Sequence, residues 1–209
     1  MLNRAFSFAM FRFALLLQMT FFPSWSIGQT EPVLAPGFPL LFDTSELFNP
    51  IEGPTLADLN RDGRLEILVV GGTTVFAFQT DGSLLPGWPQ ATTYPNVNSP
   101  AVGDLDNDGN LDVVICDRFG FGRKSFLYAW NASGQLLPGF PQEFGLAATA
   151  ATLYDLDGDG ALEIINSFER QFYVFNHDGS VRQGWPKDLA PFAPISKASV
   201  GGPQRGWRT

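Results

Sequence analysis

The amino-acid sequence predicts an all-β fold built from three copies of one unit. Two observations lead to this prediction: an acidic loop containing glycine occurs three times, and two short apolar runs follow each occurrence. The first runs read LEILVV, LDVVIC and LEIINS, and the second alternate around aromatic residues, as in TVFAFQ, SFLYAW and QFYVFN. Runs of this length and composition are typical of β-strands, and the sequence lacks the sustained 3.6-residue period of a helix.

The three units share their order and their spacing. Their acidic loops begin at Asp58, Asp104 and Asp155, which stand 46 and 51 residues apart, and each unit closes on Gly-Phe-Pro or Gly-Trp-Pro. This period is typical of a four-stranded β-propeller blade. The predicted fold class is therefore a partial β-propeller of about three four-stranded blades. Tight turns are expected at Asp81-Gly82, Ser133-Gly134 and Asp178-Gly179.

The repeat pattern divides the chain into six segments. They are a signal peptide (1–28), the end of a preceding blade or a linker (29–53), three repeats (54–99, 100–145 and 146–190) and a truncated start of a fourth repeat (191–209). Repeat 2 carries an insertion, DRFGFGRK at 117–124, which a surface loop can absorb. The final segment contains ASVGG, similar to the AVGD that precedes the second acidic loop, but no acidic loop follows. We therefore expect the chain to be a fragment of a longer propeller.

The N-terminus has the pattern of a secretory signal peptide. Arg4 and Arg12 precede an apolar run at 13–22, and small residues precede an expected cleavage after Gly28. The alternative is an uncleaved membrane anchor, but the run is shorter than the ~20 residues of a membrane span. Cleavage removes two arginines and changes the net charge from −8 to −10. This acidic balance disfavours nucleic acid as a partner.

The acidic loops place oxygen donors at positions 1, 3, 5 and 9, with glycine at position 6 and a backbone carbonyl available at position 7. The predicted metal ligands are Asp58, Asn60, Asp62, Arg64 and Glu66 in the first loop, Asp104, Asp106, Asp108, Asn110 and Asp112 in the second, and Asp155, Asp157, Asp159, Ala161 and Glu163 in the third. Carboxylates at this density repel one another unless a cation lies between them, and Ca²⁺ accepts six to eight oxygens in a flexible shell. Mg²⁺ is disfavoured because it demands near-ideal octahedral geometry.

An EF-hand begins with a similar pattern and is excluded by its twelfth position. That position falls on Val69, Ile115 and Asn166, none of which is the bidentate glutamate that an EF-hand requires. Loop charge then ranks the sites, because the first loop has the neutral Asn60 where the others have aspartate. We expect the first loop to bind Ca²⁺ most weakly, and we expect the ions to stabilise the fold rather than to catalyse a reaction.

The pattern AVGDLDNDGNLDVVI at 101–115, repeated at 57–70 and 154–165, resembles the FG-GAP/VCBS repeats of integrin alpha-subunit propellers and of bacterial secreted proteins. The likeness covers residues 36–201. It implies Ca²⁺ bound by the loop residues named above and an integrin alpha N-terminal-like propeller, which in the family closes with about seven blades. The literal Phe-Gly-Gly-Ala-Pro signature is absent from this sequence, which favours the looser bacterial type.

Together these features predict a secreted or cell-surface, non-enzymatic module that binds a protein or glycan and serves adhesion. The closing aromatics Trp88, Phe140 and Trp185 either stack on sugars or pack between blades, and packing is favoured. The alternative function is a fragment of a propeller enzyme, of the polysaccharide lyase or quinoprotein dehydrogenase type. His177 in the turn NHDGS is expected to be a solvated turn residue rather than a general base, and the single cysteine, Cys116, to be buried.

Three blades do not close a ring. The open strand edges predict self-association of the chain, and a third possibility is that the reading frame gives no stable product.

Overall fold

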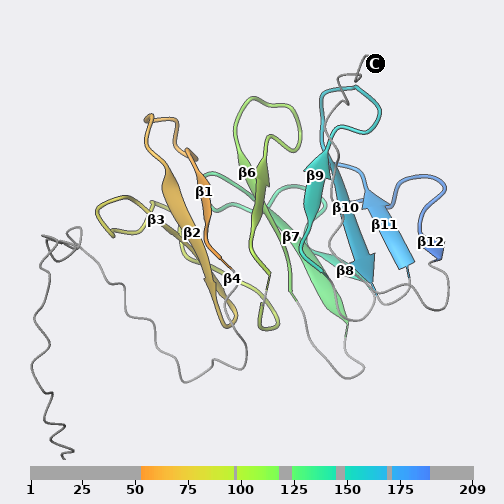
Figure 1. Cartoon of the computed structure of the whole chain (residues 1–209), viewed down its shortest axis with the longest axis horizontal. Coiled ribbons are helices and arrows are strands. Elements are labelled where there is room, and N and C mark those ends of the chain that lie inside the picture. The colour runs from red at the N-terminus through yellow and green to blue at the C-terminus, as the bar shows by residue number, and fades with distance from the viewer. Residues whose placement is uncertain (1–52, 97, 118–123, 145–148, 169–170, 189–209) are drawn as a thin grey trace, which may run out of the picture. The chain divides into compact units, whose positions relative to one another are not determined.

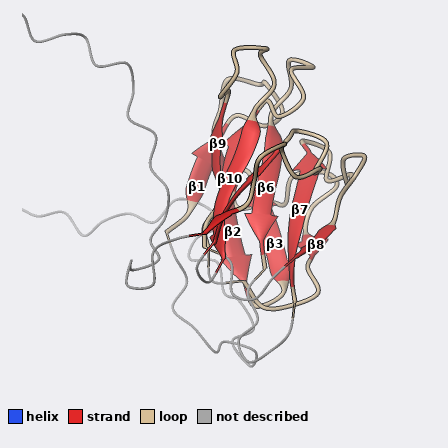
Figure 2. Ribbon diagram, turned by 90° about the vertical axis from the view of Figure 1, so that its right-hand side faces the viewer, coloured by secondary structure: helices blue, strands red, loops and turns tan. Residues whose placement is uncertain are grey.

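The structure is a computed structural model that describes residues 53–96, 98–117, 124–144, 149–168 and 171–188. The predicted signal peptide, the segment 29–53 apart from its last residue, and the segment 191–209 lie outside the described residues. All regular elements of the described part are strands, as Figure 2 shows. This part contains no helix long and apolar enough to span a membrane.

The strands of the described residues form three antiparallel four-stranded sheets, which are blades 1, 2 and 3 (Figure 1). Blade 1 consists of β1 (Thr55–Ala57), β2 (Glu66–Gly71), β3 (Thr74–Phe78) and β4 (Gln90–Ala91). Blade 2 consists of β5 (Ala101–Gly103), β6 (Asp112–Cys116), β7 (Ser125–Asn131) and β8 (Gln142–Phe144). Blade 3 consists of β9 (Thr152–Tyr154), β10 (Glu163–Phe168), β11 (Gln171–Phe175) and β12 (Lys187–Asp188). Strands pair in sequence order within each blade, which confirms the all-β prediction and its four-stranded units.

Tight turns follow the third strand of each blade at the predicted positions. Gly82, Gly134 and Gly179 have φ angles of 85°, 75° and 80°, which glycine adopts without the penalty of a Cβ. After each turn the chain makes one more bridge to the strand it has just left, at Phe78↔Leu84 and its two equivalents. These bridges give a position-by-position correspondence between the blades.

The core lies between the blades. Strand β6, an inner strand of blade 2, is buried on both faces, so its residues belong alternately to two apolar core clusters, one on each face of the sheet. Val113 and Ile115 pack with residues of blade 1, whereas Val114 and Cys116 pack with residues of blade 3. A strand buried on both faces requires the continuous apolar run that DVVIC provides. The prediction that Cys116 is buried is confirmed, because its exposure is 0%.

Two of the three closing aromatics pack against the following blade. Trp88 is 5% exposed, meets Trp130 of blade 2 edge to face at 6.1 Å, and its Nε1 donates a hydrogen bond to the Ala132 carbonyl at 3.0 Å. Phe140 is buried in the cluster shared by blades 2 and 3. Trp185, in the same position of blade 3, is only half-buried. Packing between blades is therefore the role of the first two aromatics.

A buried polar cluster also joins blades 1 and 2. Asp117 is fully buried and accepts hydrogen bonds from the backbone N–H groups of Tyr94 at 3.1 Å and Phe126 at 2.6 Å. Burial raises the pKa of Asp117 to about 6, against the lowering effect of these bonds. Asp117 is the first residue of the predicted insertion 117–124 and is buried, while residues 118–123 lie outside the described part.

Candidate metal-binding loops

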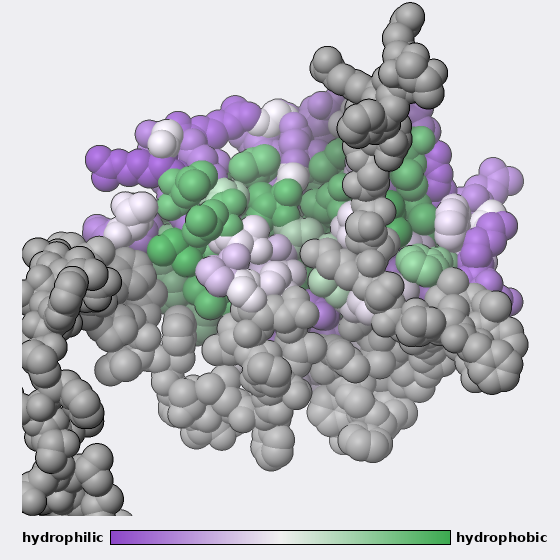
Figure 3. Space-filling view, in the orientation of Figure 1, coloured by the Kyte–Doolittle hydropathy of each residue, from purple (hydrophilic) through white to green (hydrophobic). Residues whose placement is uncertain are grey.

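The predicted ligands lie on three equivalent connections, each joining the first strand of a blade to the second. We call them loop one (58–66), loop two (104–112) and loop three (155–163). All three lie at the same end of the strands, at the upper edge of Figure 1. Figure 3 shows hydrophilic residues gathered along this edge, above an apolar band. Their exposed position makes the loops accessible to a cation from solvent.

The side chains of each loop hold the backbone in one repeated pattern. The aspartate at position 1 accepts the N–H of the position 6 glycine, at 3.0 Å in loop one, 2.9 Å in loop two and 3.1 Å in loop three. Position 3 accepts the N–H of position 5, and position 5 accepts the N–H of position 7. The side-chain oxygens therefore converge on the inside of a tight turn, as the glycine at position 6 allows with φ between 85° and 96°.

The carboxylate at position 9 binds a different part of the backbone in all three loops. It accepts the N–H of position 2, at 2.8 Å for Glu66 and Leu59, 2.8 Å for Asp112 and Leu105, and 2.7 Å for Glu163 and Leu156. Each of these acidic residues is almost completely buried at the start of the second strand. The bond closes the loop across its base and leaves a second carboxylate oxygen for another partner.

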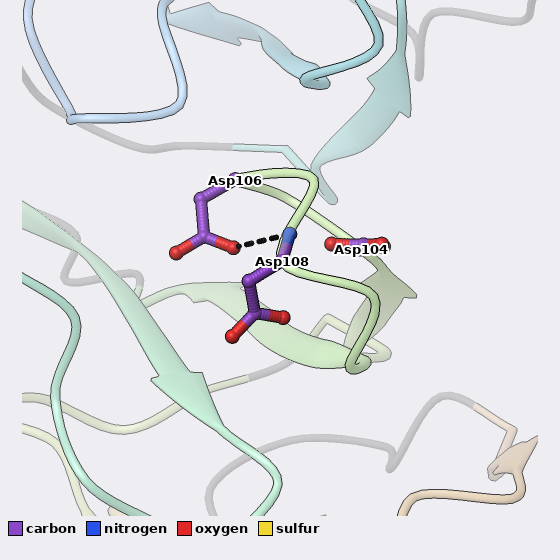
Figure 4. A group of neighbouring side chains, drawn as sticks. All are labelled: Asp104, Asp106 and Asp108. Carbon is purple, nitrogen blue, oxygen red and sulfur yellow. Dashed lines mark hydrogen bonds between the residues drawn. The ribbon is translucent and has the colours of Figure 1, made fainter.

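Carboxylates cluster in two of the loops. Oxygens of Asp104, Asp106 and Asp108 in loop two lie within 4.8 Å of one another (Figure 4), and the same is true of Asp155, Asp157 and Asp159 in loop three. Loop one presents two aspartates and Asn60 at the same positions, so it brings less charge together.

One oxygen of loop two has no partner. Asp104 Oδ1 is buried and makes no hydrogen bond, although its sister oxygen accepts the N–H of Gly109. Burial, together with the carboxylates of Asp106, Asp108 and Asp104, raises the pKa of Asp112 to about 6, against the lowering effect of the Leu105 N–H bond. A cation among these oxygens would give Asp104 Oδ1 a partner and would lower the repulsion between Asp112 and the neighbouring carboxylates. The donor set of loop two thus fits a hard divalent cation.

Neighbouring loops touch one another. A Cβ on Gly109 would lie in ordinary contact with the Arg61 guanidinium, at 3.5 Å, whereas a Cβ on Gly160 would lie only 2.5 Å from the Asn107 amide nitrogen. Arg61 and Asn107 both stand at position 4 and have φ angles of 59°, in the left-handed region. The positive φ favours glycine at position 6 of all three loops, and in loop three the close approach of Asn107 leaves no room for a Cβ on Gly160 as well.

Sequence reasoning missed one residue of this group, Arg182. Its guanidinium bonds Asp157 Oδ2 at 2.8 Å and Glu163 Oε1 at 2.7 Å, so it bridges positions 3 and 9 of loop three. The signal in the sequence was the replacement of LLPG, found in repeats 1 and 2, by VRQG in repeat 3.

Residues 58–115, from the first residue of loop one into β6, match the model of the FG-GAP-like repeat. The chain carries an FG-GAP-like repeat. The match contains loop one, strands β2 to β5, loop two and β6 as far as Ile115. Blade 3 repeats the same strand order and the same hydrogen bonds around its loop.

Comparison of structures found fifteen similar chains. One is the crystal structure of the V. cholerae biofilm matrix protein Bap1, with 20% identity and a TM-score of 0.33 over 65% of this chain. The aligned part is 28% of the Bap1 chain. No curated protein matched the sequence.

The remaining candidate of the sequence, His177, is exposed in the turn between β11 and β12, as predicted. Its positive charge contributes to lowering the pKa of Asp178, after the hydrogen bonds that Ser180 donates to that carboxylate.

Proposed function

We propose that the chain is a secreted, calcium-binding FG-GAP-like repeat protein in which each described blade binds one Ca²⁺ through its acidic loop. The observation that carries the proposal is the identical arrangement of donors in three loops, with carboxylate oxygens converging within 4.8 Å in loops two and three. The unpartnered Asp104 Oδ1 supports it further. The proposed ligands are the side chains at positions 1, 3, 5 and 9 and the carbonyl at position 7.

The proposed role of the ion is structural. Loop one touches loop two through Arg61 and Gly109, and loop two touches loop three through Asn107 and Gly160, so a cation that fixes one of these loops also fixes a contact between blades. A site at a free Ca²⁺ concentration 100 times its Kd adds about 2.7 kcal/mol to the free energy of unfolding. For a domain of this size that raises Tm by roughly 5–10 °C.

Calorimetric titration of the full chain with Ca²⁺, combined with thermal unfolding, tests the proposal. We expect saturation near three ions, with loop one the weakest, and a rise in Tm. The variant Asp106→Asn with Asp108→Asn removes two charges from loop two and is expected to lose one ion. Its matched control, Glu143→Gln with Asp188→Asn, removes two exposed charges outside the loops and is expected to bind as wild type. Absence of binding, or equal loss in the control, would contradict the proposal.

The module is proposed to be non-enzymatic and to present the propeller to a protein or glycan at the cell surface, as in adhesion. The FG-GAP-like repeat match and the exposed apolar side chains Leu84, Leu136 and Val181, one at the same position of each blade, support a binding role. Incubation of the chain with pectin separates the two candidate classes. Calcium-dependent retention without cleavage would support a binding module, and cleavage would support the propeller-lyase alternative.

A further inference from the structure

Arg182 occupies a position that is leucine in the other two blades. Its N–H bonds the Val174 carbonyl at 2.8 Å, as Leu85 bonds Ala77 and Leu137 bonds Ala129, both at 2.9 Å. The three residues therefore follow the hairpin turn at the same point of each blade. In blade 1 this leucine is part of the core, with 4% exposure. Arginine in its place brings a fixed positive charge to the third blade alone.

The guanidinium of Arg182 reaches into loop three. It bonds the exposed Asp157 at position 3 and the buried Glu163 at position 9, so it connects the solvent-facing part of the loop to the start of strand β10. The Arg182 hydrogen bond is the main cause that holds the pKa of Asp157 below its usual value. Arginine presents a planar fork of donors that suits two carboxylates at once. It takes the Glu163 oxygen that the position 2 N–H leaves available.

Loop two provides the comparison. It has the same four acidic positions as loop three, with aspartate in place of glutamate at position 9. Within the described part of the chain, no salt bridge reaches loop two or loop one. Loops two and three thus have equal numbers of acidic side chains, but they differ in their contact with a guanidinium: Arg61 lies against Gly109 of loop two without a salt bridge, whereas Arg182 forms two salt bridges with loop three.

We propose that Arg182 is an internal counter-cation of loop three, which holds the loop in shape without metal and competes with Ca²⁺ for Asp157 and Glu163. This inference rests on the proposed function of the loops as calcium sites. Binding of Ca²⁺ to loop three requires the guanidinium to leave at least one of these oxygens, whereas loop two has no such requirement. Loop three is therefore weaker than loop two despite its equal acidity, and it acts as a site that fills only at higher Ca²⁺.

The test uses Tb³⁺ as a probe of loop three in the full chain. Tyr154 directly precedes Asp155, and the residues at the same place in the other blades are Ala57 and Gly103. Tb³⁺ emission excited through tyrosine and abolished by Tyr154→Phe is the loop three signal, and its displacement by Ca²⁺ gives the affinity. Arg182→Leu, which restores the residue of the other blades, and Arg182→Gln are expected to bind Ca²⁺ in loop three about tenfold more tightly. Lys187→Gln removes one exposed positive charge from the same blade and is expected to change little.

The possible outcomes separate the two proposals. Tighter binding in both Arg182 variants, together with a lower Tm of Arg182→Gln in metal-free buffer, would support the internal counter-cation. Unchanged affinity in the Arg182 variants, while calorimetry still detects Ca²⁺ binding to the wild type, would overturn this inference alone. Absence of Ca²⁺ binding to any loop of the wild type would overturn the proposed function and this inference with it.

Discussion

Replacement of Trp88 by alanine tests whether the contact between blades holds the molecule together. The side chain is 5% exposed, its ring lies edge-on against Trp130, and its Nε1–H satisfies the Ala132 carbonyl of the next blade. Truncation of a buried tryptophan to alanine costs about 3–5 kcal/mol, and this change also leaves that carbonyl without its donor. We therefore expect the free energy of unfolding to fall by about 4 kcal/mol.

Trp185→Ala is the matched control, because Trp185 occupies the same position in blade 3 and is half-buried. Its truncation should cost about 1–2 kcal/mol, because less apolar area returns to water. Both free energies come from urea unfolding of the full chain at fixed Ca²⁺, followed by far-ultraviolet circular dichroism. Equal costs for the two variants, or a cost below about 1 kcal/mol for Trp88→Ala, would refute the reasoning.

Three further predictions address single features. Because the pKa of Asp117 is raised to about 6, its contribution to stability is full below about pH 4 and is lost as pH rises through 6. In wild type we expect the free energy of unfolding to fall by up to about 3 kcal/mol between pH 4 and pH 6, and in Asp117→Asn we expect this fall to be smaller. Urea unfolding at several pH values measures it, and the same pH dependence in both proteins would contradict the prediction. Gly87→Ala places a Cβ against the backbone of the next hairpin, whereas Gly184, with a similar φ, has free space. Thermal unfolding should show the larger loss for Gly87→Ala, and equal losses would count against a steric cause. Leu156 is exposed and Trp185 half-buried on the face of blade 3 that corresponds to the faces blades 1 and 2 bury against the next blade, which we call its rear face. This apolar rear face predicts self-association of the full chain, which a monodisperse monomer in light scattering would disprove.

The blade architecture could be predicted from sequence because its signals are local. Strand runs, x-Gly turns and acidic loops each occupy fewer than about ten residues, and their threefold occurrence confirms the reading of each copy. The burial of Cys116 followed from the same local pattern, since a continuous apolar run requires cover on both faces.

The contacts of Arg182 and Asp117 could not be predicted in the same way. Arg182 meets Asp157 and Glu163 only because the hairpin of blade 3 folds back beside its own loop, 25 and 19 residues away in sequence. Asp117 looked like the start of a surface insertion, and its burial depends on the backbone of Tyr94 in the preceding blade. Such pairings arise from the packing of elements, which no repeat pattern encodes.

The repeats also act as internal controls for packing. Leu59 and Leu105, at position 2 of loops one and two, are 2% and 0% exposed, yet Leu156 at the same position of loop three is 45% exposed. The backbone N–H of position 2 makes the same hydrogen bond in all three loops, so the difference in exposure comes from the neighbour: a following blade covers the first two leucines. Trp185 of blade 3 is likewise more exposed than Trp88 of blade 1. The rear face of blade 3 therefore carries side chains suited to an interface between blades, and any partner that covers it must bring the apolar surface that blades 2 and 3 bring to the blades before them.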